Sequence, residues 1–229
     1  MIVAERKPFD EIKEKVKGQK KLLVLGCGTC VSVCQAGGEK EVGLLATQLR
    51  MVNKADGAEV EIGEITIQRQ CDREFIEPIM EKAKQYDAVL SMACGAGVQL
   101  MAELLEPMTV LPALNTRFIG ITADEGTWLE KCRACGNCLL ADYAGICPMT
   151  MCAKSLVNGS CGGYKNGKCE TSTDRNCAWI MIYERLKKRN QLDKMRELNP
   201  LKNYGAQSHP ARQINEASTK PKLSEAKSK

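Results

Sequence analysis

The sequence predicts an α/β fold with an open, mostly parallel sheet of the Rossmann or flavodoxin type, then a small cysteine-rich module and a C-terminal helix. In the first half of the chain, short apolar runs alternate with helical patterns, as in parallel sheets with crossover helices. In the second half, eight of the thirteen cysteines fall between residues 132 and 177. We therefore expect an α/β domain over residues 1–123, a cysteine-rich module with its closing helix over residues 124–198, and a basic flexible tail over residues 199–229.

The predicted elements follow in chain order. Residues 22–25 form an apolar run typical of a buried strand, which ends in a glycine- and cysteine-rich turn. From residue 39 onward, apolar residues recur at helical spacing. The other expected elements are strands at 60–62 and 65–67, a helix over 73–86, a strand over 88–92, a helix over 94–106, and strands at 109–111 and 117–121. The last two strands would complete the open sheet near residue 123.

The second domain is expected to depend on metal for its stability. It is rich in glycine and cysteine and poor in long apolar runs, so it cannot bury enough surface to fold unaided. A helix from about residue 178 closes it, and the pair Asn199-Pro200 is expected to end the ordered body. The apolar positions of that helix, expected to pack against the neighbouring domain, are Trp179, Ile182, Tyr183 and Leu186.

The cysteine run of the second half indicates iron–sulfur ligation. Its first three cysteines have the spacing C-x2-C-x2-C, and a later Cys147-Pro148 follows, a combination typical of ferredoxin-type four-iron clusters. A zinc site more often shows two well-separated C-x2-C pairs. The eight candidate ligands, enough for two clusters or for one cluster and one zinc, are Cys132, Cys135, Cys138, Cys147, Cys152, Cys161, Cys169 and Cys177. The fourth ligand of the triplet is Cys147 or Cys177, and the spacing leaves the pairing open.

A second candidate centre lies in the first half of the chain. Its five cysteines are Cys27, Cys30, Cys34, Cys71 and Cys94. Three of them follow predicted strands, and the carboxyl ends of parallel strands meet at one edge of a sheet, where ligands bind. A four-thiolate cluster would use four of these five thiols and leave one spare. The first choice for the spare thiol is Cys27, because consecutive C-x2-C-x3-C ligands are crowded, and the second choice is Cys71. The alternative is that Cys71 and Cys94 are buried packing residues.

Other chemistries find little support in the sequence. The turn after residue 25 begins like a G-x-G-x-x-G phosphate loop but lacks its third glycine. The single histidine, His209, lies in the tail, so a Ser/His/Asp triad in the body is excluded. No pair of carboxylates is placed for acid–base work. A chain with many thiols and no proton-transfer groups is expected to carry electrons, or to be a non-catalytic subunit.

Charge and composition argue against nucleic acid and membrane partners. The net charge is +5, of which +4 lies in residues 201–229 (six Lys and Arg against two Glu), so the remainder is near neutral at +1. Only 4% of residues are aromatic, too few for a base-stacking surface. The N-terminus has no apolar signal segment, and no stretch is apolar for long enough to span a bilayer. We therefore expect a cytoplasmic protein.

Two stretches resemble a known family. They are Gly26-Cys-Gly-Thr-Cys-Val-Ser-Val-Cys34, continuing to Lys40, and Leu156-Val-Asn-Gly-Ser-Cys-Gly-Gly163 with the later Cys169 and Cys177-Ala-Trp179. Over roughly residues 1–198 the chain resembles the small iron–sulfur subunit of bacterial methylene-tetrahydrofolate reductase, of the family of the reductase's C-terminal domain. Such subunits occur in acetogens and related anaerobes.

The resemblance implies two or three [4Fe-4S] clusters and a partner. That partner is a barrel-fold, flavin-containing reductase catalytic subunit, which holds the flavin and the folate and accepts electrons from this chain in the acetyl-CoA (Wood–Ljungdahl) pathway of one-carbon metabolism. The protein that donates electrons to this chain is left open. Two rival functions are a zinc-stabilised scaffold that recruits the flavoprotein and a redox or iron sensor.

Overall fold

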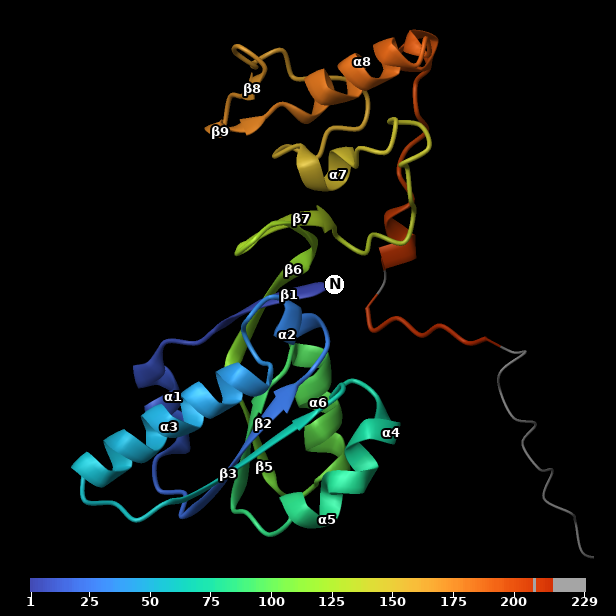
Figure 1. The fold of residues 1–229 in the computed structure, drawn as a ribbon. Helices are drawn as coiled ribbons and strands as arrows, with labels where there is room; N and C mark the ends of the chain where they lie inside the picture. The colour runs from blue at the N-terminus through green and yellow to red at the C-terminus, as the bar shows by residue number, and fades with distance from the viewer. Residues whose placement is uncertain (208, 216–229) are drawn as a thin grey trace, which may run out of the picture. The chain divides into compact units, whose positions relative to one another are not determined.

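The computed structural model describes residues 1–207 and 209–215 (Figure 1). They divide into two compact units: Met1–Arg133 with Met149–Ala153, and Ala134–Pro148 with the described residues from Lys154 onward. The domain boundary expected after residue 123 precedes a strand that pairs with residues 119–124, so the first unit extends to Arg133. No helix among the described residues is long and apolar enough to cross a bilayer.

A parallel sheet of four strands forms the centre of the first unit, which confirms the predicted fold class. Its strands are β2 (Lys21–Cys27), β3 (Glu61–Ile67), β4 (Ala88–Met92) and β5 (Thr109–Pro112). Their order is β3-β2-β4-β5, and every neighbouring pair is parallel. In chain order this is second, first, third, fourth, which is the flavodoxin-like order. The direction of winding reverses between β2 and β4, so the ligand-binding crevice of such folds lies at their carboxyl ends.

Helices cover both faces of this sheet (Figure 1). They are α1 (Phe9–Val16), α2 (Cys30–Val33), α3 (Glu39–Ala55), α4 (Arg73–Ile76), α5 (Met80–Ala83) and α6 (Gly95–Leu104). Side chains alternate across β2: Leu22 and Val24 belong to the core with α1 and α3, whereas Leu23 and Leu25 belong to the core with α4, α5 and α6. This alternation is the period of two that a strand buried on both faces requires.

Two predicted elements differ in detail from those observed. The two strands expected at 60–62 and 65–67 are one strand, β3, which continues through Gly63. The glycine there leaves room for the Tyr86 side chain, which a Cβ would meet. The helix expected over 73–86 is broken into α4, a 3-10 turn at Glu77–Ile79 and α5. The proline inside that turn has no amide hydrogen to continue the α-helical pattern.

A second, antiparallel sheet corrects the prediction for residues 117–121. These residues lie in β6 (Leu114–Asp124), which pairs with β1 (Ile2–Arg6) and β7 (Thr127–Cys132) in the order β1-β6-β7. They therefore do not extend the parallel sheet. The hairpin between β6 and β7 turns at Gly126, whose φ of +69° is readily adopted only by glycine.

The second unit is built around a helix and an aromatic pair. Its elements are β8 (Lys168–Cys169), β9 (Ser172–Asn176), α8 (Ala178–Lys188) and 3-10 turns at Leu192–Met195 and Tyr204–Gln207, whereas the short helix α7 (Pro148–Met151) lies mostly in the first unit. The predicted closing helix is thus confirmed as α8. Its Trp179 packs edge-on against Tyr143 at 5.5 Å between ring centroids and donates to the carbonyl oxygen of Leu156 at 3.1 Å. Tyr183, which was expected to be buried, is 37% exposed.

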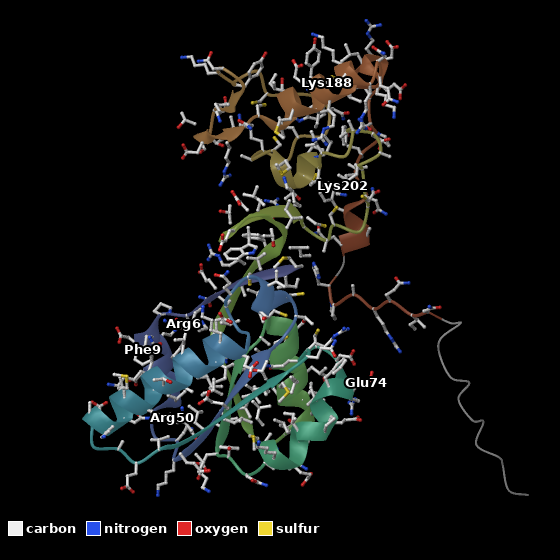
Figure 2. All side chains as sticks on the ribbon, in the orientation of Figure 1. Arg6, Phe9, Arg50, Glu74, Lys188 and Lys202 are labelled. Atoms are coloured by element: carbon white, nitrogen blue, oxygen red, sulfur yellow. The ribbon has the colours of Figure 1, made fainter. Side chains whose placement is uncertain are left out.

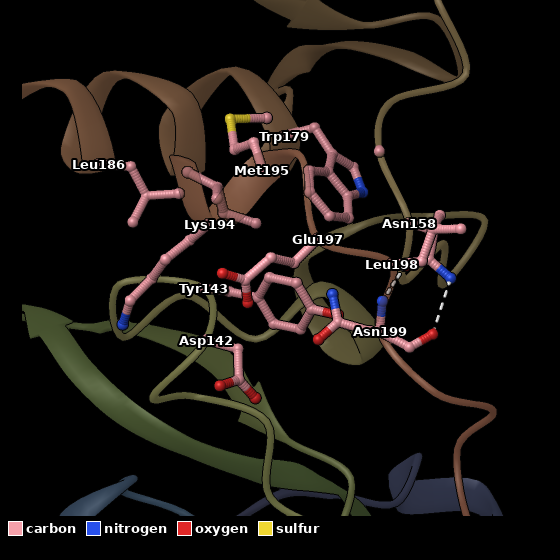
Figure 3. Close-up of a pocket in the computed structure, with 12 residues that line it drawn as sticks. Asp142, Tyr143, Asn158, Trp179, Leu186, Lys194, Met195, Glu197, Leu198 and Asn199 are labelled. Carbon is pink, nitrogen blue, oxygen red and sulfur yellow. Dashed lines mark hydrogen bonds between the residues drawn. The ribbon is translucent and has the colours of Figure 1, made fainter. Parts of the chain in front are cut away.

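Residues 194–199 pack beside α8 and enclose a small cavity (Figure 3). The cavity measures about 40 Å³, room for little more than water. Asn158 and Asn199 pair across its rim: the Asn158 amide donates to the Asn199 carbonyl oxygen at 3.3 Å, and the Asn199 N–H donates back at 2.9 Å. Packing continues past Pro200, because Lys202 is only 6% exposed, so the ordered body does not end at Asn199-Pro200.

Candidate metal centres

The carboxyl edge of the parallel sheet carries three of the five N-terminal cysteines. Strand β2 ends at Cys27 itself, and Cys71 lies in the loop that follows β3. Cys94 follows β4 and is the N-cap residue of α6. Cys27 and Cys94 therefore follow β2 and β4, the two strands between which the winding reverses. The structure thus places at this edge the three cysteines that the sequence put after strands.

A buried glutamine ties the loops of these cysteines to one another. Gln70 immediately precedes Cys71 and has no exposed surface. Its amide donates to the carbonyl oxygen of Leu25 on β2 at 2.9 Å, and its carbonyl oxygen accepts from the hydroxyl of Ser91 on β4 at 2.6 Å. A Cβ on Gly97 of α6 would come within 2.9 Å of the Gln70 Cβ. The glutamine therefore contacts the segments of all three cysteines, although a single polar residue in a loop gives no sequence signal for this role.

The thiols at this edge influence one another electrostatically. The pKa of Cys71 is raised, first because its thiol is partly removed from water and next because the charges of Cys94 and Cys27 lie near it; the Arg69 guanidinium opposes this weakly. Three thiolates at such separations repel each other, and a bound cation removes that penalty.

Helix α6 adds a favourable field for negative charge at Cys94. The residue is the N-cap of a ten-residue helix and has no side-chain capping bond. The positive end of a helix dipole stabilises a thiolate at its N-terminus. The Gly95 N–H donates to the Thr116 hydroxyl at 2.9 Å, which fixes the start of the helix beside β6.

Cys34 has a different environment from the other N-terminal cysteines. It is buried, and its sulfur lies 3.5 Å from the carbonyl oxygens of Ala4 and Val31 and accepts from the Ala4 N–H at 3.5 Å. Burial is the largest cause that raises the pKa of this thiol, and the charge of Cys30 adds to it. Cys34 is thus held by backbone groups near β1. Cys30, the first residue of α2, is only half-buried.

The C-terminal cysteines are divided between the two compact units. Cys132 and Cys152 belong to the first unit and the other six belong to the second. Cys177 is buried and is the N-cap residue of α8, and its N–H donates to the Gly167 carbonyl oxygen at 2.8 Å. The pKa of Cys169 is lowered, chiefly by the Thr171 hydroxyl 3.2 Å away. The eight thiols of this half of the chain thus differ in burial: some are exposed, some are half-buried and one, Cys177, is buried.

Two lysines contact the cysteine-bearing loops of the second unit. Lys154 forms an ion pair with Glu170 and hydrogen bonds with the Cys161 thiol. The Lys202 ammonium donates to the Asn137 carbonyl oxygen at 2.8 Å, beside Cys135. Sequence reasoning missed both lysines. Lys154 lies only two residues after Cys152, but no local pattern pairs it with Glu170 or Cys161, and Lys202 lies beyond the last cysteine, Cys177.

The donor chemistry at both sites fits a soft metal. Cysteine supplies the sulfur donors, and thiolates bind iron–sulfur clusters or zinc. Across residues 1–207 and 209–215, no group of three or more His, Cys, Asp or Glu side chains is arranged to hold a metal ion. The fit therefore rests on the kind of donor and, in the first unit, on the shared sheet edge with its interacting thiols.

Comparison with known proteins relates the second half of the chain to one family. Residues 111–205 match the family model described as methylene-tetrahydrofolate reductase C terminal. The match covers the eight cysteines from Cys132 to Cys177 and also Lys202. No curated protein and no solved structure matches the chain. The N-terminal cysteine edge lies outside the matched residues.

Proposed function

We propose, from the relation of residues 111–205 to the C-terminal family of methylene-tetrahydrofolate reductase, that this chain is the electron-transfer subunit of such a reductase. In this proposal its cysteines hold two or three [4Fe-4S] clusters. The partner is a flavin-containing catalytic subunit, and a separate donor protein supplies the electrons. We place the complex in the cytoplasm of an anaerobe such as an acetogen, in the Wood–Ljungdahl pathway.

The structural observation that supports the proposal is the placement of three thiols at the carboxyl edge of the parallel sheet. Cys27, Cys71 and Cys94 come from three neighbouring strands, and their charges interact. Cys30 is our choice for the fourth ligand, because Cys34 is buried among the backbone groups of Ala4 and Val31. A four-iron cluster held by these thiolates would accept and release one electron at a time.

The remaining residues at this edge have supporting roles in the proposal. Gln70 fixes the Cys71 loop to β2 and β4 by two buried hydrogen bonds. The N-terminus of α6 offsets negative charge at Cys94. The C-terminal thiols, from Cys132 to Cys177, supply the ligands for one or two further centres. Proton transfer and folate binding are assigned to the partner, because the body of this chain lacks histidine.

A direct test mixes the reduced chain with its partner. The chain, purified without oxygen, is reduced with a limiting amount of titanium(III) citrate and mixed in a stopped-flow instrument with the oxidised flavoprotein. We expect the flavin band to bleach while the cluster band recovers, in proportion to the electrons loaded. The control is the flavoprotein with the same chain after its metal has been removed. Equal bleaching in both samples would contradict the proposal.

A further inference from the structure

Lys202 is a buried charge without a carboxylate partner. It is 6% exposed, and the other buried polar residues of the described chain, Gln70 and Ser91, are neutral and paired with each other. Its ammonium donates to the Asn137 carbonyl oxygen at 2.8 Å (Lys202 is labelled in Figure 2). Among the residues that the structure describes, no Asp or Glu forms an ion pair with it. Burial of an ammonium is unfavourable unless a negative charge lies near it.

A candidate for that negative charge is the Cys135 sulfur. It lies 3.6 Å from the same Asn137 carbonyl oxygen. The Lys202 side chain also forms a hydrogen bond with the Cys135 side chain, so the ammonium and the sulfur contact each other and the same Asn137 carbonyl oxygen. A cation in contact with a cysteine sulfur stabilises negative charge on it, and the thiolate is the form that binds a metal.

The chain segment that carries Lys202 is fixed against the cysteine loop. A Cβ on Gly136 would lie 2.5 Å from the Ala206 carbonyl oxygen, so only glycine lets the segment approach so closely. Three residues before the lysine, Asn199 exchanges two hydrogen bonds with Asn158. Contacts on both sides of Lys202 thus hold its side chain at the loop between Cys135 and Cys138.

We propose that Lys202 is the counter-charge of an anionic metal–thiolate centre that includes Cys135. Four thiolates give a [4Fe-4S] cluster or a zinc ion a net negative charge, and a buried ammonium beside one ligand stabilises that charge. The inference rests on the proposed function for the identity of the metal as iron, but the role of the lysine holds for zinc as well. Lys202 is a positioning and charge-compensating residue rather than a catalytic one.

The test compares Lys202→Met, which removes the charge but keeps the length of the side chain, with Lys202→Arg, which keeps the charge. Each full-length protein is purified without oxygen, and its metal loss to a chelator is followed in time, together with a redox titration monitored by electron paramagnetic resonance. We expect Lys202→Met to lose metal from one centre about tenfold faster, since 1.4 kcal/mol corresponds to tenfold. Its reduction midpoint should become more negative. Lys202→Arg should lose metal within about threefold of the wild-type rate, which corresponds to about half of that energy.

A third variant separates charge from packing. Asn158→Ala removes the paired hydrogen bonds that hold residue 199 but leaves the lysine in place. Metal loss from Asn158→Ala as fast as from Lys202→Met, with an unchanged midpoint in both, would overturn the proposal in favour of simple packing. Wild-type rates and midpoint in Lys202→Met would also overturn it. A wild-type protein that holds only zinc would end the electron-transfer proposal, while the rate of zinc release would still test Lys202. A protein without metal would end both.

Discussion

Replacing Gln70 with leucine tests whether this residue holds the N-terminal cysteine loops together. The change removes the 2.9 Å bond to the Leu25 carbonyl oxygen and the 2.6 Å bond from the Ser91 hydroxyl. Both partners lose that hydrogen bond inside a fully buried site. An unsatisfied buried polar group costs about 1–3 kcal/mol, and two are left here, so we expect Gln70→Leu to destabilise the first unit by about 2–6 kcal/mol.

A double-mutant cycle with Ser91→Ala checks the origin of this cost. The single change Ser91→Ala leaves the Gln70 carbonyl oxygen without its donor and should cost about 1–3 kcal/mol. In the double variant the Ser91 hydroxyl is no longer stranded, so the total should fall short of the sum by about 1–2 kcal/mol. Urea unfolding, with hydrogen exchange of β2 and β4 to report on the first unit, measures all four proteins. Additive costs would show that the two side chains do not interact.

Iron content separates positioning of the cysteines from general stability. Leu105→Ala is the matched control, because Leu105 is 2% exposed, lies in the core with α6, and costs about 2–5 kcal/mol on truncation to alanine. We expect Gln70→Leu to lose most of the iron of one cluster, about four per chain, and Leu105→Ala to lose little. Equal iron loss from the two variants would refute the positioning role of Gln70.

Two further predictions concern the thiols and the aromatic pair. Cys71→Ser should remove about four irons per chain. Cys34→Ala should retain them, because the Cys34 thiol is hydrogen-bonded to the backbone near β1. Iron analysis of both variants tests this, and the reverse result would make Cys34 the ligand and Cys71 the spare thiol. Tyr143→Phe removes the 2.6 Å hydrogen bond from the Tyr143 hydroxyl to the Val157 carbonyl oxygen. It should cost about 1–3 kcal/mol, measured by urea unfolding followed by the fluorescence of the two tryptophans, Trp128 and Trp179, with no change in iron. An unchanged midpoint would mean that water replaces the bond.

The sequence was sufficient to predict the parallel sheet, because its strands are apolar runs buried on both faces. The side chains of Leu22–Leu25 belong to both cores of the first unit, and a short run that is apolar at every position is typical of a strand buried on both faces. The predicted position of the three cysteines after strands followed from the same runs. Residues 117–121 were placed in the wrong sheet because their composition indicates a strand but does not say with which strand it pairs.

Other features of the site depend on contacts between residues far apart in the chain. Gln70 and Ser91 are 21 residues apart, and neither belongs to a recognisable motif. Lys202 contacts the carbonyl of a residue 65 positions earlier, and it follows an Asn-Pro pair that normally ends an ordered segment. Local patterns carry no information on such pairs. The choice of Cys27 as the spare thiol rests on crowding along the chain and stays a prediction; the charge of Cys27 is one of the causes that raise the pKa of Cys71.

The central claim, that the thiols of this chain hold iron–sulfur clusters, is tested most directly by metal analysis. Iron, acid-labile sulfide and zinc are measured per chain on protein purified without oxygen, with the visible spectrum recorded before and after reduction. We predict about eight or twelve irons, from two or three clusters of four, with matching sulfide and a broad band that bleaches on reduction. Zinc with almost no iron would contradict the claim and leave a structural scaffold.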